Sequence, residues 1–169
     1  WVVRALAELG RRDRAARLLA MLSPVRHAAS AEAVATYQVE PYVVAADVYG
    51  TSPHVGRGGW TWYTGSAAWM YRVALESVLG FTVEAGEQLR LAPRVPDEWP
   101  RFRIRYRLPD GRTRYEILVE NPDGRAETVR EVRIDGAPGS LRDGAAIVPL
   151  VRDGGEHRVV LCLGTSQHN

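Results

Sequence analysis

The chain has 169 residues, of which 46% are hydrophobic and 25% are charged, and its formal net charge is +2. These values are ordinary for a folded globular protein, and the length suits one domain or parts of two. The 22 basic residues are all arginine and are interspersed with acids, so no basic stripe indicates a nucleic-acid partner. The single cysteine, Cys162, excludes an internal disulfide, the histidines show no metal-ligand spacing, and no apolar run approaches the ~18 residues that span a membrane.

The first half of the chain carries apolar residues at helical spacing. This pattern predicts helices over residues 1–9, 14–22, 41–49 and 65–79, with a polar connection around residues 30–32. Gly10 ends the first helix and Asp13 caps the second, while Pro41 stands in the first turn of the third, where its missing N–H costs nothing. The fourth helix is apolar on most sides, which is typical of a helix buried between others.

Beyond Pro93 the apolar pattern changes from helical to alternating. Phe102, Ile104 and Tyr106 alternate with arginines, which predicts a half-exposed strand. Further strands are predicted around residues 115–119, 129–134, 146–150 and 157–163, separated by turns that contain Gly and Asp. Short strands at this spacing indicate a small antiparallel β-sandwich. The sequence therefore predicts an α+β chain, with helices over residues 1–92 and a sandwich over residues 93–169.

Residues 54–66 gather glycines, aromatic residues and hydroxyl residues just before the fourth predicted helix. Glycine lets the main chain approach a ligand closely, and aromatic faces stack on sugar rings. The free N–H groups and the positive dipole end of a helix start suit a phosphate. The segment therefore suits a polyol and an anion together. Thr64 as a simple helix cap, and Trp60 and Trp62 as core residues, remain the alternatives.

Glycoside cleavage requires a carboxylic acid that protonates the leaving oxygen, and in phosphorolysis the phosphate replaces the second carboxylate. The carboxylates near the glycine-rich segment are Glu40, Asp47 and Glu76. Glu40 has tyrosine and glutamine neighbours, although a helix cap or a solvated acid explains it equally well. His54 and Arg57 suit a sugar hydroxyl or a phosphate, and an exposed loop is their alternative.

Three stretches in the first half, residues 37–42, 53–67 and 69–72, closely resemble the C-terminal end of glycoside hydrolase family 94. These enzymes are inverting β-glycoside phosphorylases, and the similarity is greatest to the cyclic β-1,2-glucan synthases. Shorter matches to the tail of that family occur at residues 96–99, 115–117, 121–122 and 135–136.

The resemblance implies that the helices are the last ones of an (α/α)6 barrel and that a jelly-roll-like sandwich follows. It also implies that Thr64 and Gly65 contact the attacking phosphate. Glu40, with Gln38 beside it, is expected near the acceptor sugar, and Arg57 and Trp60 are the further sugar-binding candidates. No metal or organic cofactor is implied, because inorganic phosphate is the co-substrate.

The general acid of the family is an aspartic acid in a motif that is expected upstream of residue 1, and no such motif occurs in this sequence. The resemblance therefore implies a C-terminal fragment that adds phosphate-binding and sugar-binding residues to a β-glucan-processing enzyme. The expected partners are a β-glucan oligosaccharide, phosphate and the remainder of a parent polypeptide. Helix faces that a partial barrel leaves open favour a homo-oligomer. The expected location is cytoplasmic, including the cytoplasmic part of an inner-membrane protein. The alternative function is a non-catalytic carbohydrate-binding or structural module.

Overall fold

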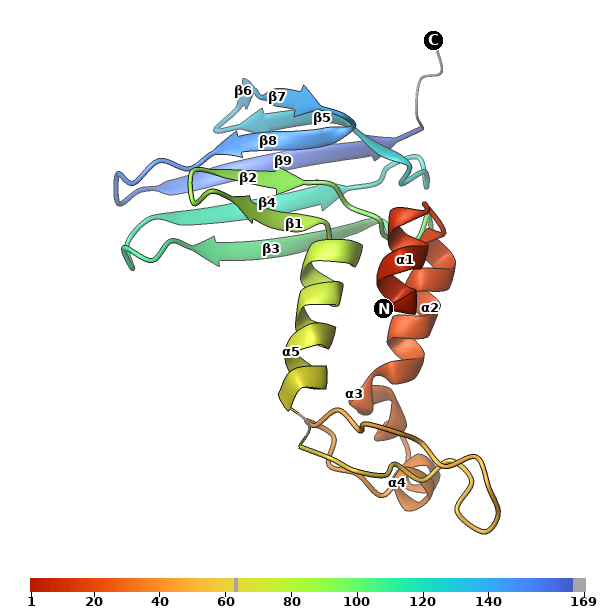
Figure 1. Cartoon of the computed structure of the whole chain (residues 1–169). Coiled ribbons are helices and arrows are strands. Elements are labelled where there is room, and N and C mark those ends of the chain that lie inside the picture. Colours follow the sequence, from red (N-terminus) through yellow and green to blue (C-terminus); the bar gives the residue numbers. More distant parts are fainter. Residues whose placement is uncertain (63, 166–169) are drawn as a thin grey trace.

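The computed structural model describes residues 1–62 and 64–165. The molecule is elongated, with helices at one end and two β-sheets at the other (Figure 1). The helical half contains α1 (Val2–Glu8), α2 (Arg12–Leu22), α3 (Pro24–His27), α4 (Ala31–Tyr37) and α5 (Thr64–Arg72), and α5 continues into the π-helix η1 (Val73–Val78). The first, second and fourth predicted helices are thereby confirmed within a few residues.

The helix predicted over residues 41–49 is wrong, and a helix lies instead in the preceding segment. Ser30, interpreted as part of a polar connection, caps α4 by accepting a hydrogen bond from Ala33 N to its Oγ at 3.1 Å. Residues 46–49 are extended and pair with the glycine-rich segment, including an antiparallel bridge between Val48 and Gly58. The pairing of this stretch with the glycine-rich segment, together with its β-branched side chains, therefore favours an extended main chain over the helix that the apolar spacing predicts.

The fourth predicted helix differs from its prediction in burial. No residue of α5 is buried, and only Val73, Ser77 and Val78 of η1 are buried. The buried turn of η1 packs against α1 and α2 and leads into the sheets, whereas α5 extends away from them (Figure 1). Within the described residues, neighbouring helices therefore cover only one end of this apolar helix.

The strand half comprises two sheets. One has the order β1-β2-β8-β7 and the other the order β3-β4-β9-β5-β6. Their strands are β1 (Phe81–Glu84), β2 (Gln88–Leu91), β3 (Arg101–Arg107), β4 (Arg114–Glu120), β5 (Thr128–Ile134), β6 (Ala137–Pro138), β7 (Ser140–Arg142), β8 (Ala145–Pro149) and β9 (Glu156–Gly164). All the predicted strands are present, and β3 shows the expected alternation of exposed arginines with half-buried apolar residues.

Two details of the sheets differ from the prediction. The sheets are not purely antiparallel, because β9 lies between β4 and β5 and runs parallel to β4. Strand formation also begins earlier than residue 93, since β1 and β2 precede this position and β2 pairs with β8. Each of these two strands alternates polar and apolar residues, but each has only four residues. The α+β class is confirmed, while the barrel, the jelly roll and the domain boundary at residues 92 and 93 stay predictions.

A single hydrophobic core joins the helices to both sheets. Its buried members come from α1, α2, η1 and the inward faces of the strands, among them Val3, Ala7, Ala15, Val78, Leu89, Leu91, Ile117, Val119, Val148, Val159 and Leu161. An ion pair reinforces the junction, because Arg12 Nη2 of α2 lies 2.9 Å from Asp97 Oδ1 in the loop before β3. The sheets therefore hold one end of the helices, and the other end carries the glycine-rich loop.

Candidate functional site

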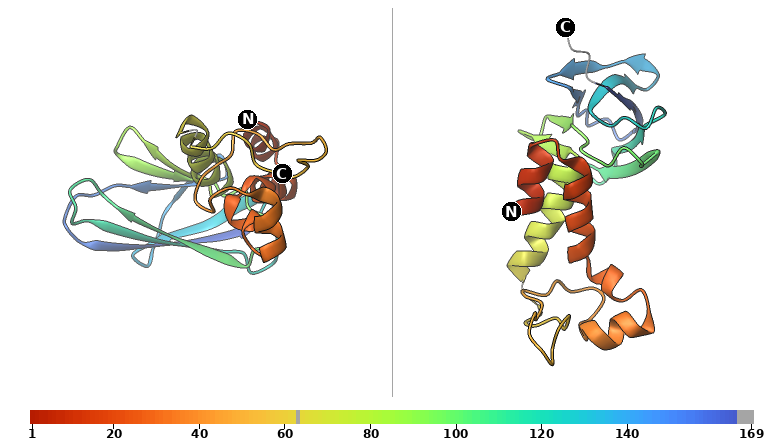
Figure 2. Two further views of the ribbon diagram at one scale, coloured as in Figure 1. Left: turned by 90° about the horizontal axis from the view of Figure 1, so that it is seen from below. Right: turned by 90° about the vertical axis from the view of Figure 1, so that its right-hand side faces the viewer.

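The glycine-rich segment lies at the end of the helices that is far from the sheets. Residues 38–62 form an irregular loop beside α4, and the start of α5 adjoins this loop (Figures 1 and 2). All six of the predicted site residues therefore lie in one region of the molecule. They come from the C-terminal end of α4, from the loop itself and from the first turn of α5.

Three glycines of the segment are required by packing within the loop. A Cβ atom at Gly58 would overlap Val39 Cγ2 and lie 3.3 Å from the ring of Tyr37, and a Cβ atom at Gly59 would overlap the carboxylate of Asp47. Gly56 has φ +85°, in the left-handed region that favours glycine. These glycines bring the loop close to α4 and to Asp47. Among the glycines of this segment, Gly65 fits the prediction that glycine admits a ligand, because no tertiary neighbour among the described residues lies within 4 Å of an added Cβ.

The side chain of Glu40 faces an aromatic cluster. Its Oε1 accepts a hydrogen bond from Trp62 Nε1 at 3.3 Å, and the ring of Trp62 meets Tyr42 edge-on at 6.1 Å between centroids. Tyr42, Trp60 and Trp62 are 72%, 71% and 64% exposed. Such exposure is unusual for aromatic side chains and rules out the core interpretation of Trp60 and Trp62 within this chain. A carboxylate beside exposed ring faces can bind sugar hydroxyls while the rings stack on the sugar.

Gln38 and Arg57 come together on another side of the loop. Gln38 ends α4 in the left-handed region with φ 54°, and its Nε2 donates to Ala35 O at 3.0 Å. The two residues line a cavity of about 230 Å³ together with Ala35, Thr36, Pro53, His54 and Val55. This cavity carries the guanidinium of Arg57 and the imidazole of His54, which suit hydroxyl or anionic oxygens. Glu40 is not among its lining residues.

Thr64 and Gly65 occupy the first turn of α5, and both are exposed. α5 begins at Thr64 itself, so this residue is the first of the helix. The first N–H groups of a helix have no acceptor within the helix and carry the positive end of its dipole. This turn can therefore donate hydrogen bonds to an oxyanion.

The sequence names Asp47 among the carboxylates near the glycine-rich segment but gives it no role, and it does not single out Tyr42 for the site. In the structure Asp47 Oδ1 accepts a hydrogen bond from Trp60 N at 3.1 Å. The signal that could have found Asp47 is its place in a β-branched stretch that follows a proline, which favours extended structure over helix.

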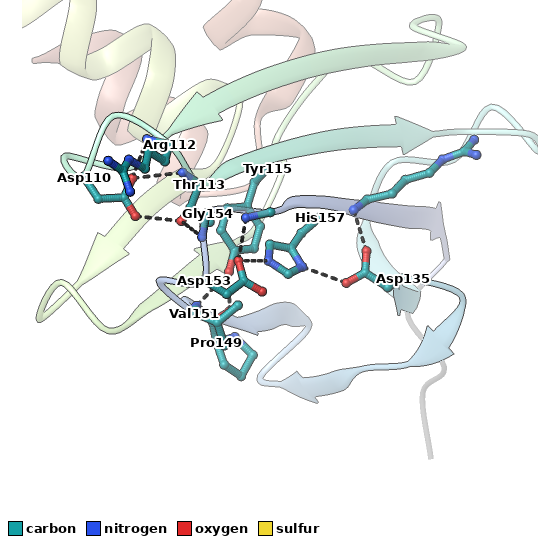
Figure 3. A network of polar contacts seen from close by, with 12 residues as sticks. Asp110, Arg112, Thr113, Tyr115, Asp135, Pro149, Val151, Asp153, Gly154 and His157 are labelled. Atoms are coloured by element: carbon teal, nitrogen blue, oxygen red, sulfur yellow. Dashed lines mark hydrogen bonds and ion pairs between the residues drawn. The ribbon is translucent and has the colours of Figure 1, made fainter.

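A second polar cluster lies in the strand half (Figure 3). His157 Nδ1 lies 2.8 Å from Asp135 Oδ2, and its Nε2 lies 3.2 Å from Asp153 Oδ1. The imidazole packs on Tyr115, whose hydroxyl accepts from Val151 N at 2.8 Å. The hydrogen bond with Asp135 is the largest effect and raises the pKa of His157 above its ordinary value. Burial, the next largest, lowers it, and the hydrogen bond with Asp153 raises it again. This cluster ties two turns to β9.

Within residues 1–62 and 64–165, no group of three or more His, Cys, Asp or Glu side chains could hold a metal ion. The same residues contain no helix with the length and apolar character that a membrane crossing requires.

The helical half is similar in sequence to a known catalytic domain. Residues 1–80 match the family model described as "Glycosyl hydrolase 94 superfamily, catalytic domain". The match covers all the helices and the glycine-rich loop, and it ends one residue before β1. The predicted resemblance to glycoside hydrolase family 94 is therefore confirmed.

Two relatives make the similarity more specific. The chain is 51% identical over 102 residues to the cyclic beta-(1,2)-glucan synthase NdvB of Rhizobium meliloti (strain 1021), an alignment that covers 60% of this chain and 4% of the relative. It is 33% identical over 61 residues to the solabiose phosphorylase of Paenibacillus borealis, covering 36% of this chain and 8% of that protein. The chain thus spans only a small part of the length of either relative.

Proposed function

We propose that this chain supplies the phosphate-binding and sugar-binding side of a β-glycoside phosphorylase or cyclic β-glucan synthase site. The observation that carries the proposal is the match of residues 1–80 to the family 94 catalytic domain, together with the gathering of all six candidate residues at one end of the helices. Thr64 and Gly65 bind phosphate, while Glu40, Gln38, Arg57 and Trp60 bind the sugar. The substrate class is a β-linked gluco-oligosaccharide.

The chemistry asked of these residues is binding and orientation. In inverting phosphorolysis a phosphate oxygen attacks the anomeric carbon while a carboxylic acid protonates the leaving oxygen. The first turn of α5 holds the phosphate through N–H groups and the hydroxyl of Thr64. Glu40 accepts hydrogen bonds from sugar hydroxyls, and the exposed indoles support the ring. The proposal assigns the proton donor to no residue of this chain, and it requires inorganic phosphate without a metal or an organic cofactor.

Exposed apolar residues support the proposal that the helices belong to a larger catalytic domain. Trp1, Leu9 and Tyr71 are 79%, 75% and 69% exposed. Among the described residues, the buried indole nitrogen of Trp69 has no hydrogen-bond partner, although its ring packs against Trp1 at 4.4 Å. Further helices of a family 94 domain would cover these faces, and the remainder of such a polypeptide is the partner we propose for them.

Titration of the ¹⁵N-labelled chain with inorganic phosphate tests the phosphate site. We expect the amide signals of Thr64 and Gly65 to shift and Thr64→Val to weaken the effect several-fold, because the variant loses a donor without losing volume. Thr82→Val, in β1, is the matched control and should leave the response at α5 unchanged. Equal shifts at the starts of α4 and α5, or an unchanged response in Thr64→Val, would contradict the proposal.

The exposure of Tyr42, Trp60 and Trp62 also suits a second function, a non-catalytic carbohydrate-binding module. Titration with a β-1,2-linked glucose trimer, with and without phosphate, separates the two functions. Tight binding that does not depend on phosphate would favour the module. Weak binding that phosphate strengthens would favour part of a phosphorolytic site.

A further inference from the structure

Two segments of the glycine-rich loop, residues 46–47 and residues 59–60, lie side by side. Asp47 joins them through both its main chain and its side chain. Its carbonyl oxygen accepts from Gly59 N at 2.9 Å, and its carboxylate Oδ1 accepts from Trp60 N at 3.1 Å. Trp60 O in turn accepts from Ala46 N at 2.7 Å. Three hydrogen bonds therefore hold the main chain of residues 59 and 60 against residues 46 and 47.

The absence of a side chain at Gly59 makes this arrangement possible. A Cβ atom there would overlap both carboxylate oxygens of Asp47. The carboxylate of Asp47 thus occupies the space that a side chain at residue 59 would fill. Gly59 is the residue directly before Trp60. Trp60 as a residue remains 71% exposed although its main chain is held on both sides.

From these contacts we infer that Asp47 is the positioning residue of the sugar site: it fixes the main chain at Trp60, from which the indole that stacks on the sugar extends. This inference rests on the proposed function. An aromatic residue on a fixed main chain binds a sugar better than one on a mobile main chain, because less conformational freedom is lost when the ligand binds. Asp47 itself does not touch the sugar in this arrangement, and Glu40 and Trp60 do.

Three variants separate the charge, the hydrogen bond and the shape. Asp47→Asn retains an acceptor oxygen for Trp60 N, Asp47→Ala removes it, and Gly59→Ala displaces the carboxylate. We expect Asp47→Ala to speed hydrogen exchange at Trp60 N by about fivefold or more and to weaken binding of a β-1,2-linked glucose trimer by a similar factor. Asp47→Asn should restore both properties. Asp123→Ala, in the strand half, is the control and should alter neither.

A double-mutant cycle tests the shape argument. Gly59→Ala should weaken trimer binding strongly in the unaltered chain and little further in Asp47→Ala, since the overlapping carboxylate is then absent. Binding is followed by the fluorescence change that Trp60→Phe abolishes. Normal binding and normal exchange in Asp47→Ala would overturn this inference alone. Failure of the unaltered chain to bind the trimer would overturn the proposed sugar site, and the inference with it.

Discussion

At the scale of single residues, the two halves of the chain use ionisable groups differently. In the strand half, His157 stands between Asp135 and Asp153 and joins two turns. In the loop, Glu40 and Asp47 each accept one hydrogen bond from a tryptophan N–H, the first from an indole and the second from the main chain. The strand cluster therefore stabilises the fold, while the loop carboxylates lie beside exposed rings.

The His157 cluster predicts a pH dependence of stability. The pKa of His157 is raised above its ordinary value of 6.5, chiefly by its hydrogen bond with Asp135, so its stabilisation is complete below that pH and is lost as the pH rises through the folded-state pKa. The pKa of Asp135 is lowered from its ordinary value of 3.8, chiefly by the hydrogen bond with His157. The stabilisation from the ionised Asp135 carboxylate is therefore lost as the pH falls through the lowered pKa.

We therefore expect the free energy of unfolding to decrease between about pH 5.5 and about pH 8.5 by up to about 1 kcal/mol for the His157–Asp135 pair. Urea unfolding at both pH values measures this change. His157→Gln should remove the decrease, whereas His27→Gln, in α3, should retain it. A decrease of equal size in His157→Gln would show that other groups cause it.

Gly65 should show opposite effects on stability and on ligand binding. Because an added Cβ meets open space in the first turn of α5, Gly65→Ala should raise the free energy of unfolding by about 0.5–1 kcal/mol. The same methyl group would crowd a phosphate at that turn and weaken its binding. Thermal unfolding and phosphate titration of one variant measure both effects, and unchanged phosphate binding would remove Gly65 from the site.

At the scale of elements, α4 and the glycine-rich loop form one unit. Gly58 N donates to Tyr37 O at 2.9 Å, and the ring of Tyr37 is 5% exposed and stacks on His27 at 4.2 Å. The start of α4 depends on Ser30, and its end leads through Gln38 to Glu40. The position of Glu40 therefore depends on the cap of a seven-residue helix.

Gly58→Ala should destabilise this unit, because its Cβ would overlap Val39 Cγ2 beside the buried ring of Tyr37. Overpacking of this kind costs about 1–3 kcal/mol. Hydrogen exchange should accelerate in the loop and leave the strand half unchanged. Gly50→Ala, in the same loop, has no positive φ and open space around its Cβ, so it is the control for an added methyl group without overlap. Equal exchange in the two variants would contradict a role for packing.

At the scale of the whole molecule, Asp97 connects the helical half to the strand half. Its Oδ1 accepts from Arg12 Nη2 at 2.9 Å and from Ala126 N at 2.8 Å, and its carbonyl oxygen accepts from Asn121 Nδ2 at 2.9 Å. Burial raises the pKa of Asp97, but the Ala126 hydrogen bond and the Arg12 charge together outweigh it, so the pKa lies below its ordinary value.

Asp97→Ala should therefore lower the free energy of unfolding by about 1–3 kcal/mol, since it leaves Arg12 and Ala126 N without this acceptor. Chemical denaturation measures the loss. Asp123→Ala breaks only an exposed pair with Arg130 at 3.6 Å and should cost less than about 0.5 kcal/mol. Losses of equal size would show that Asp97 contributes no more than a surface pair.

The sequence alone determined the α+β class, three of the helices, the later strands and the region of the candidate site. Local patterns carry these features, since helical and alternating periodicities reflect which side chains face a core. Only the tertiary structure decided that residues 46–49 are extended, that β9 runs parallel to β4, and that three glycines serve packing within the loop. These features depend on contacts between residues far apart in the chain, such as Asp47 with Gly59 and β4 with β9, and no local pattern records such contacts.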